Sequence, residues 1–258
     1  MRLFYGFTIL ISFSLTISAL QVERGAWEFK GVAQAERVGK LPNFAQYTNV
    51  QEKKKTFFDF IRPMVKEENQ VLRNEYLHIK ELLQSTLNDE KISFTDQTWL
   101  ADMAAYYRVA PFDIAVKEHF EALMKKVDII PESLFLAQAA NESAWGTSRF
   151  AKNANNIFGQ WCFTPGCGIV PSSRRADETH EVQKFKTIND AVRSYIHHLN
   201  SHPFYEKLRD SRLTSRKANK APSGYAMAIG LEQYSARGLE YVKEVRSMIR
   251  YNKLEVIK

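Results

Sequence analysis

A single glutamate, Glu142, stands in the alanine-rich run "FLAQAANESAWGTSRFAK", residues 135–152. The apolar pattern predicts one helix from residue 132 to about residue 150, on which Glu142 lies near Trp145 and Arg149. A carboxyl group beside aromatic rings loses hydration, so its pKa rises and it can act as a general acid near neutral pH. The same spacing is also compatible with an ordinary surface glutamate that pairs with Arg149.

The residues after Glu142 favour the chemical interpretation. The run "NESAWGTSRFAKNANNIFGQW" resembles the catalytic signature of the peptidoglycan glucosaminidases of glycoside hydrolase family 73, in which a glutamate in "ESxWG" precedes "S..A...NN.FG". The matching residues are Glu142, Ser143, Trp145, Gly146, Ser148, Ala151, Asn155, Asn156, Phe158 and Gly159. The resemblance extends to about residue 249, where "YSARGLEYV" is similar to the form found in the exported Bax-type proteins of this family.

This resemblance implies a mostly helical α+β fold of lysozyme-like type, in which a helical lobe and a small β-hairpin lobe form a substrate groove. It also implies an endo-β-N-acetylglucosaminidase that cleaves the β-1,4 bond after N-acetylglucosamine in peptidoglycan glycan strands. Glu142 would be the general acid that protonates the departing sugar oxygen. Tyr234, in "LEQYSARG", matches a tyrosine of the family's cleft, and a second tyrosine of the family begins the last helix. Tyr234 would position the N-acetyl group or stabilise charge, with a partly buried core tyrosine as the alternative.

Five further residues are candidates for sugar binding. The motif places Asn155, Asn156 and Phe158 where they would shape the floor of the groove. Trp145 and Trp161 would stack on sugar rings, and a place in the core is an equal alternative for each of them.

A general acid needs a second group to complete hydrolysis. A base can activate water across a gap of about 6.5–9.5 Å, a nucleophile can lie nearer, or the substrate's own N-acetyl group can attack, and the sequence does not choose among these routes. In the family the second carboxylate comes from the β-lobe. Here "RRADETHEVQKF" offers Glu178 as the first candidate and Asp177 as the second, whereas Glu181 is expected within or next to a strand.

Two other functions stay open. A lytic transglycosylase also uses a single glutamate, but a "GLMQ"-like element follows it where this chain has "IFGQW". A non-catalytic wall-binding protein would keep the fold without the reaction. No metal or other cofactor is expected, because the neighbouring His197 and His198 point to different faces of a predicted helix and no glycine-rich phosphate loop is present.

The elements that must position Glu142 are mainly helices. Helical spacing predicts one or two helices over residues 52–85, started or kinked by Pro63. Further helices are predicted in "SFTDQTWLADMAAYYRV", "PFDIAVKEHFEALMKKV", "TINDAVRSYIHHLNS" and "LEYVKEVRSMIRYN". Residues 153–185 are rich in turn formers and predict loops with a small hairpin or sheet. We therefore expect an N-terminal arm and helical extension over residues 21–116 and the catalytic domain over residues 117–258.

The start of the chain indicates export. Residues 1–20 run from a basic start through an apolar middle to small residues, as in a secretory signal, and an uncleaved anchor in the envelope membrane is the alternative. Both predict an exported, periplasmic protein. Cys162 and Cys167 in "WCFTPGCG" then predict a disulfide, with zinc as the weaker alternative. The net charge of +7 is scattered, which argues against nucleic-acid binding, and the oligomeric state stays open.

Overall fold

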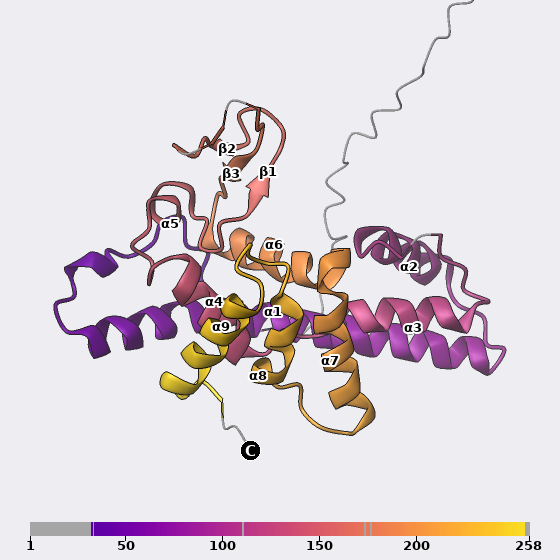
Figure 1. The fold of residues 1–258 in the computed structure, drawn as a ribbon. Helices are drawn as coiled ribbons and strands as arrows, with labels where there is room; N and C mark the ends of the chain where they lie inside the picture. Colours follow the sequence, from indigo (N-terminus) through magenta and orange to yellow (C-terminus); the bar gives the residue numbers. More distant parts are fainter. Residues whose placement is uncertain (1–31, 33, 110, 173, 176, 256–258) are drawn as a thin grey trace, which may run out of the picture.

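The computed structural model describes residues 32, 34–109, 111–172, 174–175 and 177–255 (Figure 1). The α-helices in this part of the chain are α1 (Val50–Leu87), α2 (Phe94–Tyr106), α3 (Lys117–Lys126), α4 (Glu132–Glu142), α5 (Arg149–Ala154), α6 (Ile188–Ser201), α7 (Glu206–Lys217), α8 (Gly224–Met227) and α9 (Leu239–Tyr251). Three short strands are β1 (Trp161–Cys162), β2 (Gly168–Ile169) and β3 (Glu181–Gln183). The predicted class, a mostly helical α+β fold, is therefore confirmed.

The predicted signal or anchor over residues 1–20 lies outside the described residues. Within the described residues, no helix has both the length and the apolar character that a bilayer crossing needs.

Helix α4, which ends at Glu142, lies at the centre of the core. Its residues from Ser133 to Ala140 are all buried, so the helix is enclosed on every side. It packs against α1, α8 and α9. The contact with α8 is close, since a Cβ added to Gly224 would lie 2.2 Å from the Ser133 hydroxyl oxygen. Helix α4 is thus held by helices from both halves of the chain.

Helix α1 joins the extension to the predicted catalytic domain. The side chain of its N-cap Asn49 accepts the backbone N–H groups of Gln51 and Glu52, which fixes the start of the helix. The predicted one or two helices are a single helix, and Pro63 lies inside it. Helix α1 contacts α3, α4 and α6, and Figure 1 shows it running behind the other helices from one side of the molecule to the other. The extension is therefore part of the same core.

Helix α7 was not expected from the apolar pattern. Its sequence is strongly polar, and its buried side chains are Leu208, Arg209 and Arg212. The fully buried Arg212 guanidinium donates to the Asp128 carbonyl at 2.8 Å and to the Lys125 carbonyl at 2.9 Å. Because two of these three buried side chains are arginines, the usual hydrophobic periodicity of a packed helix is weak.

The strands form a three-stranded antiparallel sheet in the order β1-β3-β2, which refines the predicted hairpin. Strands β2 and β3 contact α5, and Figure 1 shows the sheet standing out from the helices beside α5 and α6. The predicted disulfide between Cys162 and Cys167 is confirmed, with Cα atoms 6.3 Å apart. Ligand atoms of these cysteines and of Glu181 lie within 4.8 Å of one another, but the disulfide engages both sulfur atoms.

Glu181 fixes the loop that the disulfide closes. Its Oε1 accepts the Gly166 N–H at 2.9 Å and its Oε2 accepts the Gly168 N–H at 2.7 Å, and these bonds lower the pKa of Glu181. A lowered folded-state pKa gives stability that is complete above the usual glutamate pKa and is lost as the pH falls through the folded-state pKa. We expect Glu181→Gln to lower Tm at about pH 7 and to change it little at about pH 2.5. Thermal unfolding followed by circular dichroism at both pH values measures this, and an equal loss at both would contradict it.

Candidate active site

Glu142 is the last residue of α4. The prediction that this helix continues to about residue 150 is therefore wrong. Three successive residues after Ser143 take the left-handed backbone conformation: Ala144 (φ 49°), Trp145 (φ 59°) and Gly146 (φ 75°). A right-handed helix cannot pass through such a run. Helix α5 begins only at Arg149, so neither Trp145 nor Arg149 shares a helical face with Glu142.

Hydrogen bonds around Ser143 fix the turn that follows Glu142. The buried Ser143 hydroxyl donates to the Ala139 carbonyl at 2.6 Å and accepts the Gly146 N–H at 2.8 Å. The Ser143 carbonyl accepts the Ser148 N–H at 2.9 Å. The Glu142 carboxyl group is therefore carried by a helix end with little freedom to move.

The carboxyl group of Glu142 has a specific hydrogen-bond donor. The Tyr241 hydroxyl donates to Glu142 Oε1 at 2.7 Å, and the Asn141 side-chain amide approaches the same oxygen at 3.4 Å. Burial raises the pKa of Glu142, and the bonds from Tyr241 and Asn141 partly offset this rise. Charges nearby have smaller and opposite effects, since Glu244 raises this pKa and Arg237 lowers it. The sequence-based expectation of a carboxyl group with a raised pKa thus has a physical cause in the burial of Glu142.

A buried polar chain supports Tyr241 from behind. The Gln138 side-chain amide donates to the Tyr241 hydroxyl at 2.9 Å, and the Tyr195 hydroxyl donates to Gln138 Oε1. Gln138, Tyr195 and Tyr241 are each at most 1% exposed. Sequence reasoning did not name Tyr241 or Gln138 as site residues. The available signal was the second tyrosine that begins the last helix in the resembling family.

Tyr234 lies against Tyr241. Their rings stack with centroids 5.3 Å apart and planes 9° apart, and the Tyr234 hydroxyl donates to the Phe158 carbonyl at 2.9 Å. Burial raises the pKa of Tyr234 well above its usual value, so this hydroxyl is neutral at physiological pH. The structure therefore places Tyr234 beside the Glu142–Tyr241 pair, and its action on substrate stays a prediction.

The asparagine pair of the motif and Phe158 have structural partners. The Asn155 side-chain amide donates to the backbone carbonyls of Gly39, Phe185 and Lys186, and that of Asn156 donates to those of Gln160 and Gln183. Phe158 is buried and stacks on Tyr195 with ring centroids 3.7 Å apart. These contacts tie α5 and the following loop to the sheet, and direct contact of the three residues with sugar stays a prediction.

The two candidate sugar-binding tryptophans have different environments. Trp145 packs edge-on against Phe57 and Phe58 of α1, with ring centroids 5.8 and 5.2 Å apart, which favours the core alternative. Trp161 is 58% exposed, and its ring stacks on His180 with centroids 3.9 Å apart. An exposed indole can stack on a sugar ring, and the sugar-binding role of Trp161 stays a prediction.

The β-lobe carboxylates lie in or beside the connection between β2 and β3. Glu178 is 32% exposed and its carboxylate accepts the Arg175 N–H at 3.0 Å, whereas Asp177 is 74% exposed. Both pair with the Arg175 side chain, and no hydrogen bond or ion pair within the described residues joins either of them to Glu142. Glu181 is in β3, as expected, and is committed to the disulfide loop.

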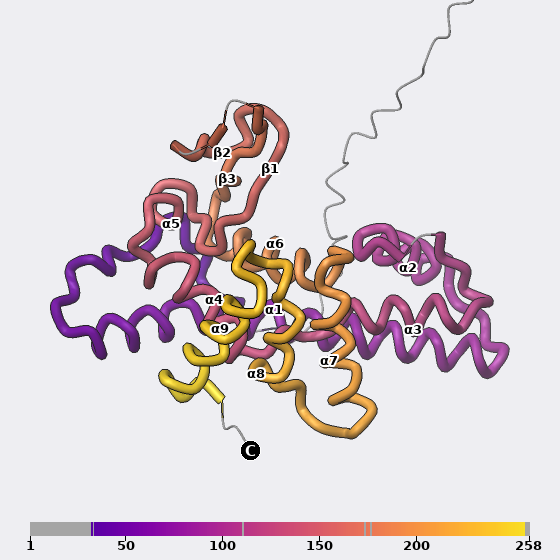
Figure 2. Tube along the Cα trace, viewed as in Figure 1, coloured from indigo at the N-terminus to yellow at the C-terminus, as the bar shows by residue number. Residues whose placement is uncertain are grey.

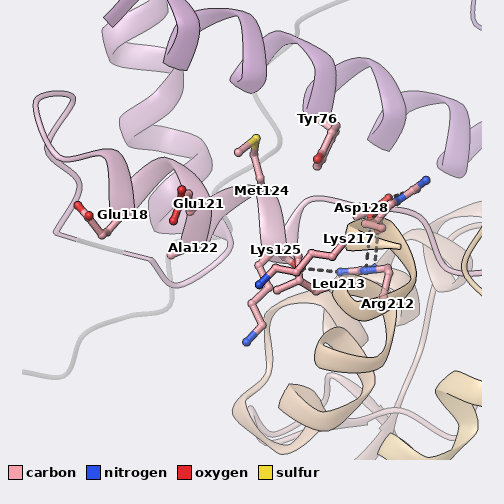
Figure 3. A pocket seen from close by; sticks show the side chains of 11 residues that line it. Tyr76, Glu118, Glu121, Ala122, Met124, Lys125, Asp128, Arg212, Leu213 and Lys217 are labelled. Carbon is pink, nitrogen blue, oxygen red and sulfur yellow. Dashed lines mark hydrogen bonds and ion pairs between the residues drawn. The ribbon is translucent and has the colours of Figure 1, made fainter. Parts of the chain in front are cut away.

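A cavity of about 510 Å³ lies away from these residues, between α1, α3 and α7 (Figure 3). Several of its charged side chains already pair within the protein, as Asp128 does with Arg216 at 2.6 Å and Lys125 does with Asp210 at 2.6 Å. Glu142 is not among its lining residues. This cavity is therefore separate from the candidate active site.

Comparison with known proteins identifies the family of this chain. The family model described as mannosyl-glycoprotein endo-β-N-acetylglucosaminidase, of the glucosaminidase family, matches residues 117–254. Protein bax of Escherichia coli (strain K12) is 31% identical over 212 residues, which is 82% of this chain and 74% of that protein. No solved structure matches the chain. The chain therefore belongs to the glucosaminidase family of glycoside hydrolases.

Proposed function

We propose that this protein is an endo-β-N-acetylglucosaminidase that cleaves the β-1,4 bond after N-acetylglucosamine in peptidoglycan strands, with Glu142 as its general acid. The observation that carries the proposal is a partly buried carboxyl group of raised pKa, fixed at a helix end and hydrogen-bonded by Tyr241. Membership of the glucosaminidase family supports glycosidic chemistry at this site.

The hydrogen bonds to Glu142 suggest which oxygen carries the proton. Tyr241 and Asn141 both donate to Oε1, so Oε1 acts as an acceptor and the acid proton is placed on Oε2. Protonation of the departing sugar oxygen by Oε2 would leave a carboxylate, and the Tyr241 hydroxyl stabilises that negative charge. The same bond therefore becomes stronger as the reaction proceeds, which is the property that lowers a barrier.

For the second group we keep Glu178 as the first candidate and Asp177 as the second. The Arg175 backbone N–H orients the Glu178 carboxylate, while Asp177 is the more exposed of the two. A fixed carboxylate is better suited than a mobile one to activate water or to act as a nucleophile. Attack by the substrate's own N-acetyl group, positioned by Tyr234, is the third route.

Digestion of purified peptidoglycan tests the proposal. We expect the wild type to release fragments with reducing N-acetylglucosamine ends, identified by mass spectrometry after borohydride reduction. Glu178→Gln is expected to lower the rate about tenfold or more, since it removes a base or nucleophile, and the neighbouring Asp177→Asn serves as the matched comparison. A larger loss of rate in Asp177→Asn would identify Asp177 as the second group instead of Glu178. Unchanged rates in both variants would favour attack by the substrate's N-acetyl group.

Two results of this digestion would contradict the proposed reaction. Anhydro-muramic acid ends would identify a lytic transglycosylase. Binding to peptidoglycan without any new chain ends would identify a non-catalytic wall-binding protein.

We further propose that the protein works outside the cytoplasm, in the periplasm. The order of residues 1–20 and the disulfide between Cys162 and Cys167 support this, because structural disulfides persist mainly in oxidising compartments. Cell fractionation tests it, and recovery of the full-length chain in the cytoplasmic fraction would contradict it.

A further inference from the structure

We propose that residues 34–58, outside the segment that matches the family, form a brace that holds the Glu142 turn in its working position, with Phe44 and Lys54 as positioning residues. The brace consists of the arm that includes the 3-10 turn η1 (Phe44–Gln46) and of the first part of α1. This inference rests on the proposed role of Glu142. In Figure 2 the indigo arm and the start of α1 lie on the same side of the molecule as α5.

Phe44 contacts the turn directly. Its side chain is buried, and a Cβ added to Gly146 would lie 2.5 Å from Phe44 Cδ2, so the ring rests against the Gly146 backbone. The ring is held edge-on by Phe57 and Phe60 of α1, with centroids 5.3 and 5.8 Å apart. The glycine of the catalytic motif thus makes room for a side chain from the extension.

Lys54 connects the turn to the helix that carries Tyr241. Its Nζ lies 5.0 Å from the centre of the Trp145 ring and 4.5 Å from that of the Tyr251 ring. The same ammonium group donates to Asn252 Oδ1 at 3.2 Å, at the end of α9. One cation of α1 therefore bridges the residue three positions after Glu142 and the helix of its hydrogen-bond donor.

The arm is also hydrogen-bonded to other parts of the predicted catalytic domain. The Val38 carbonyl accepts the Ile188 N–H at 2.8 Å, and the Gly39 carbonyl accepts the Asn155 side-chain amide at 2.9 Å. The Val38 N–H donates to Asn189 Oδ1 at 3.1 Å. These bonds fix the arm at the starts of α6 and of the loop after α5, so Phe44 is presented at a defined position.

The turn needs such support because its backbone is unfavourable. Ala144 and Trp145 hold positive φ angles, and a non-glycine residue in this region is strained, so surrounding contacts must offset the strain. The contacts to Trp145 and Gly146 come from Lys54, Phe57, Phe58 and Phe44. Without them the turn can relax, and a displacement of about 1 Å of a catalytic group can lower a rate about 100-fold.

Two variants test the brace, each with a matched control. Phe44→Ala removes the ring at Gly146, and its control Phe94→Ala removes an 84% exposed ring in the same extension. Lys54→Met removes only the ammonium group, and its control Lys55→Met removes a neighbouring ammonium that pairs with Asp59 on the surface. Kinetics on soluble glycan fragments give kcat and KM, and amide hydrogen exchange of residues 143–148 reports the turn without requiring activity.

We expect kcat to fall about tenfold in Phe44→Ala and about threefold in Lys54→Met, with KM within about twofold of wild type. The Ser148 N–H should exchange faster in both variants, Phe44→Leu should restore most of kcat, and the two controls should match the wild type. Wild-type kcat and wild-type exchange in folded Phe44→Ala and Lys54→Met would overturn the proposal. If Phe44→Ala does not fold, Lys54→Met decides alone. If the wild type cleaves no glycan, the proposed function fails, and hydrogen exchange still tests the brace.

Discussion

Glu142→Gln is expected to lower kcat for peptidoglycan cleavage about 1,000-fold, with little change in KM. The amide keeps the shape of the side chain and can still accept the Tyr241 hydroxyl, but it has no acid proton to transfer to the departing sugar oxygen. Release of reducing ends from purified peptidoglycan measures the loss. Glu240→Gln, at an exposed position on α9 that pairs with Lys243, is the matched control and should cleave at the wild-type rate.

Glu142→Gln is expected to raise the stability of the fold although it lowers kcat. Stability measurements therefore distinguish the loss of the acid proton from misfolding. Burial raises the pKa of Glu142 in the folded state, so folding becomes less favourable as the pH rises from the unfolded pKa through the folded pKa. The neutral amide avoids this penalty. We therefore expect Glu142→Gln to be more stable than the wild type at about pH 8 and to lose that advantage at about pH 4. Urea unfolding at the two pH values measures this, and a variant that is less stable at the higher pH would contradict the assignment.

Glu142 could be proposed as the acid from sequence because that proposal depends on a local pattern. Glu142 is followed within 17 residues by the tryptophan, glycine and paired asparagines of the motif, and these spacings need no knowledge of tertiary contacts. The disulfide was equally local, because Cys162 and Cys167 are separated by a turn-forming Pro-Gly pair. The helical class followed from apolar spacing over long segments, which averages over errors at single positions.

The break after Glu142 was not predictable from residue types. Ala144 and Trp145 are compatible with a continuing helix by propensity, and only Gly146 signals a possible end. Their left-handed backbone occurs where Phe44 packs against Gly146 and where the Gly146 N–H donates to the Ser143 hydroxyl. Tertiary contacts of this kind override local preference, and a single sequence gives no direct sign of them.

Tertiary contacts also make the site different from its sequence-based description. Helical spacing put Trp145 and Arg149 beside Glu142, but the neighbour that bonds the carboxyl group is Tyr241, 99 residues away in the chain. The packing of α9 against α4 brings Tyr241 to the Glu142 carboxyl group. The pKa of Glu142 is raised by burial, as expected, although neither Trp145 nor Arg149 shares a helical face with it.

Tyr241→Phe tests that long-range contact. The tyrosine hydroxyl stabilises the charged form of Glu142, so its removal should raise the pKa of Glu142 further. An acid of higher pKa keeps its proton to higher pH, and the alkaline limb of the pH profile of kcat/KM should move to higher pH. The variant also loses the donor that stabilises the carboxylate formed on proton transfer, and it leaves the Gln138 amide without its acceptor. We expect kcat to fall about 100-fold at the pH optimum.

The direction in which the alkaline limb moves distinguishes a hydroxyl that stabilises the Glu142 carboxylate from one that only fills space in the core. Tyr234→Phe removes a hydroxyl that donates to the Phe158 carbonyl rather than to Glu142, so it should leave the alkaline limb in place even if it lowers kcat through the substrate. Tyr225→Phe, on α8 under the Arg246 guanidinium, should change neither kcat nor the limb. If Tyr241 only filled space in the core, its phenylalanine variant would keep the wild-type limb, because the ring and its stacking on Tyr234 are retained. A donor at 2.7 Å stabilises the Glu142 carboxylate, so an alkaline limb that moved to lower pH in Tyr241→Phe would contradict this role of Tyr241.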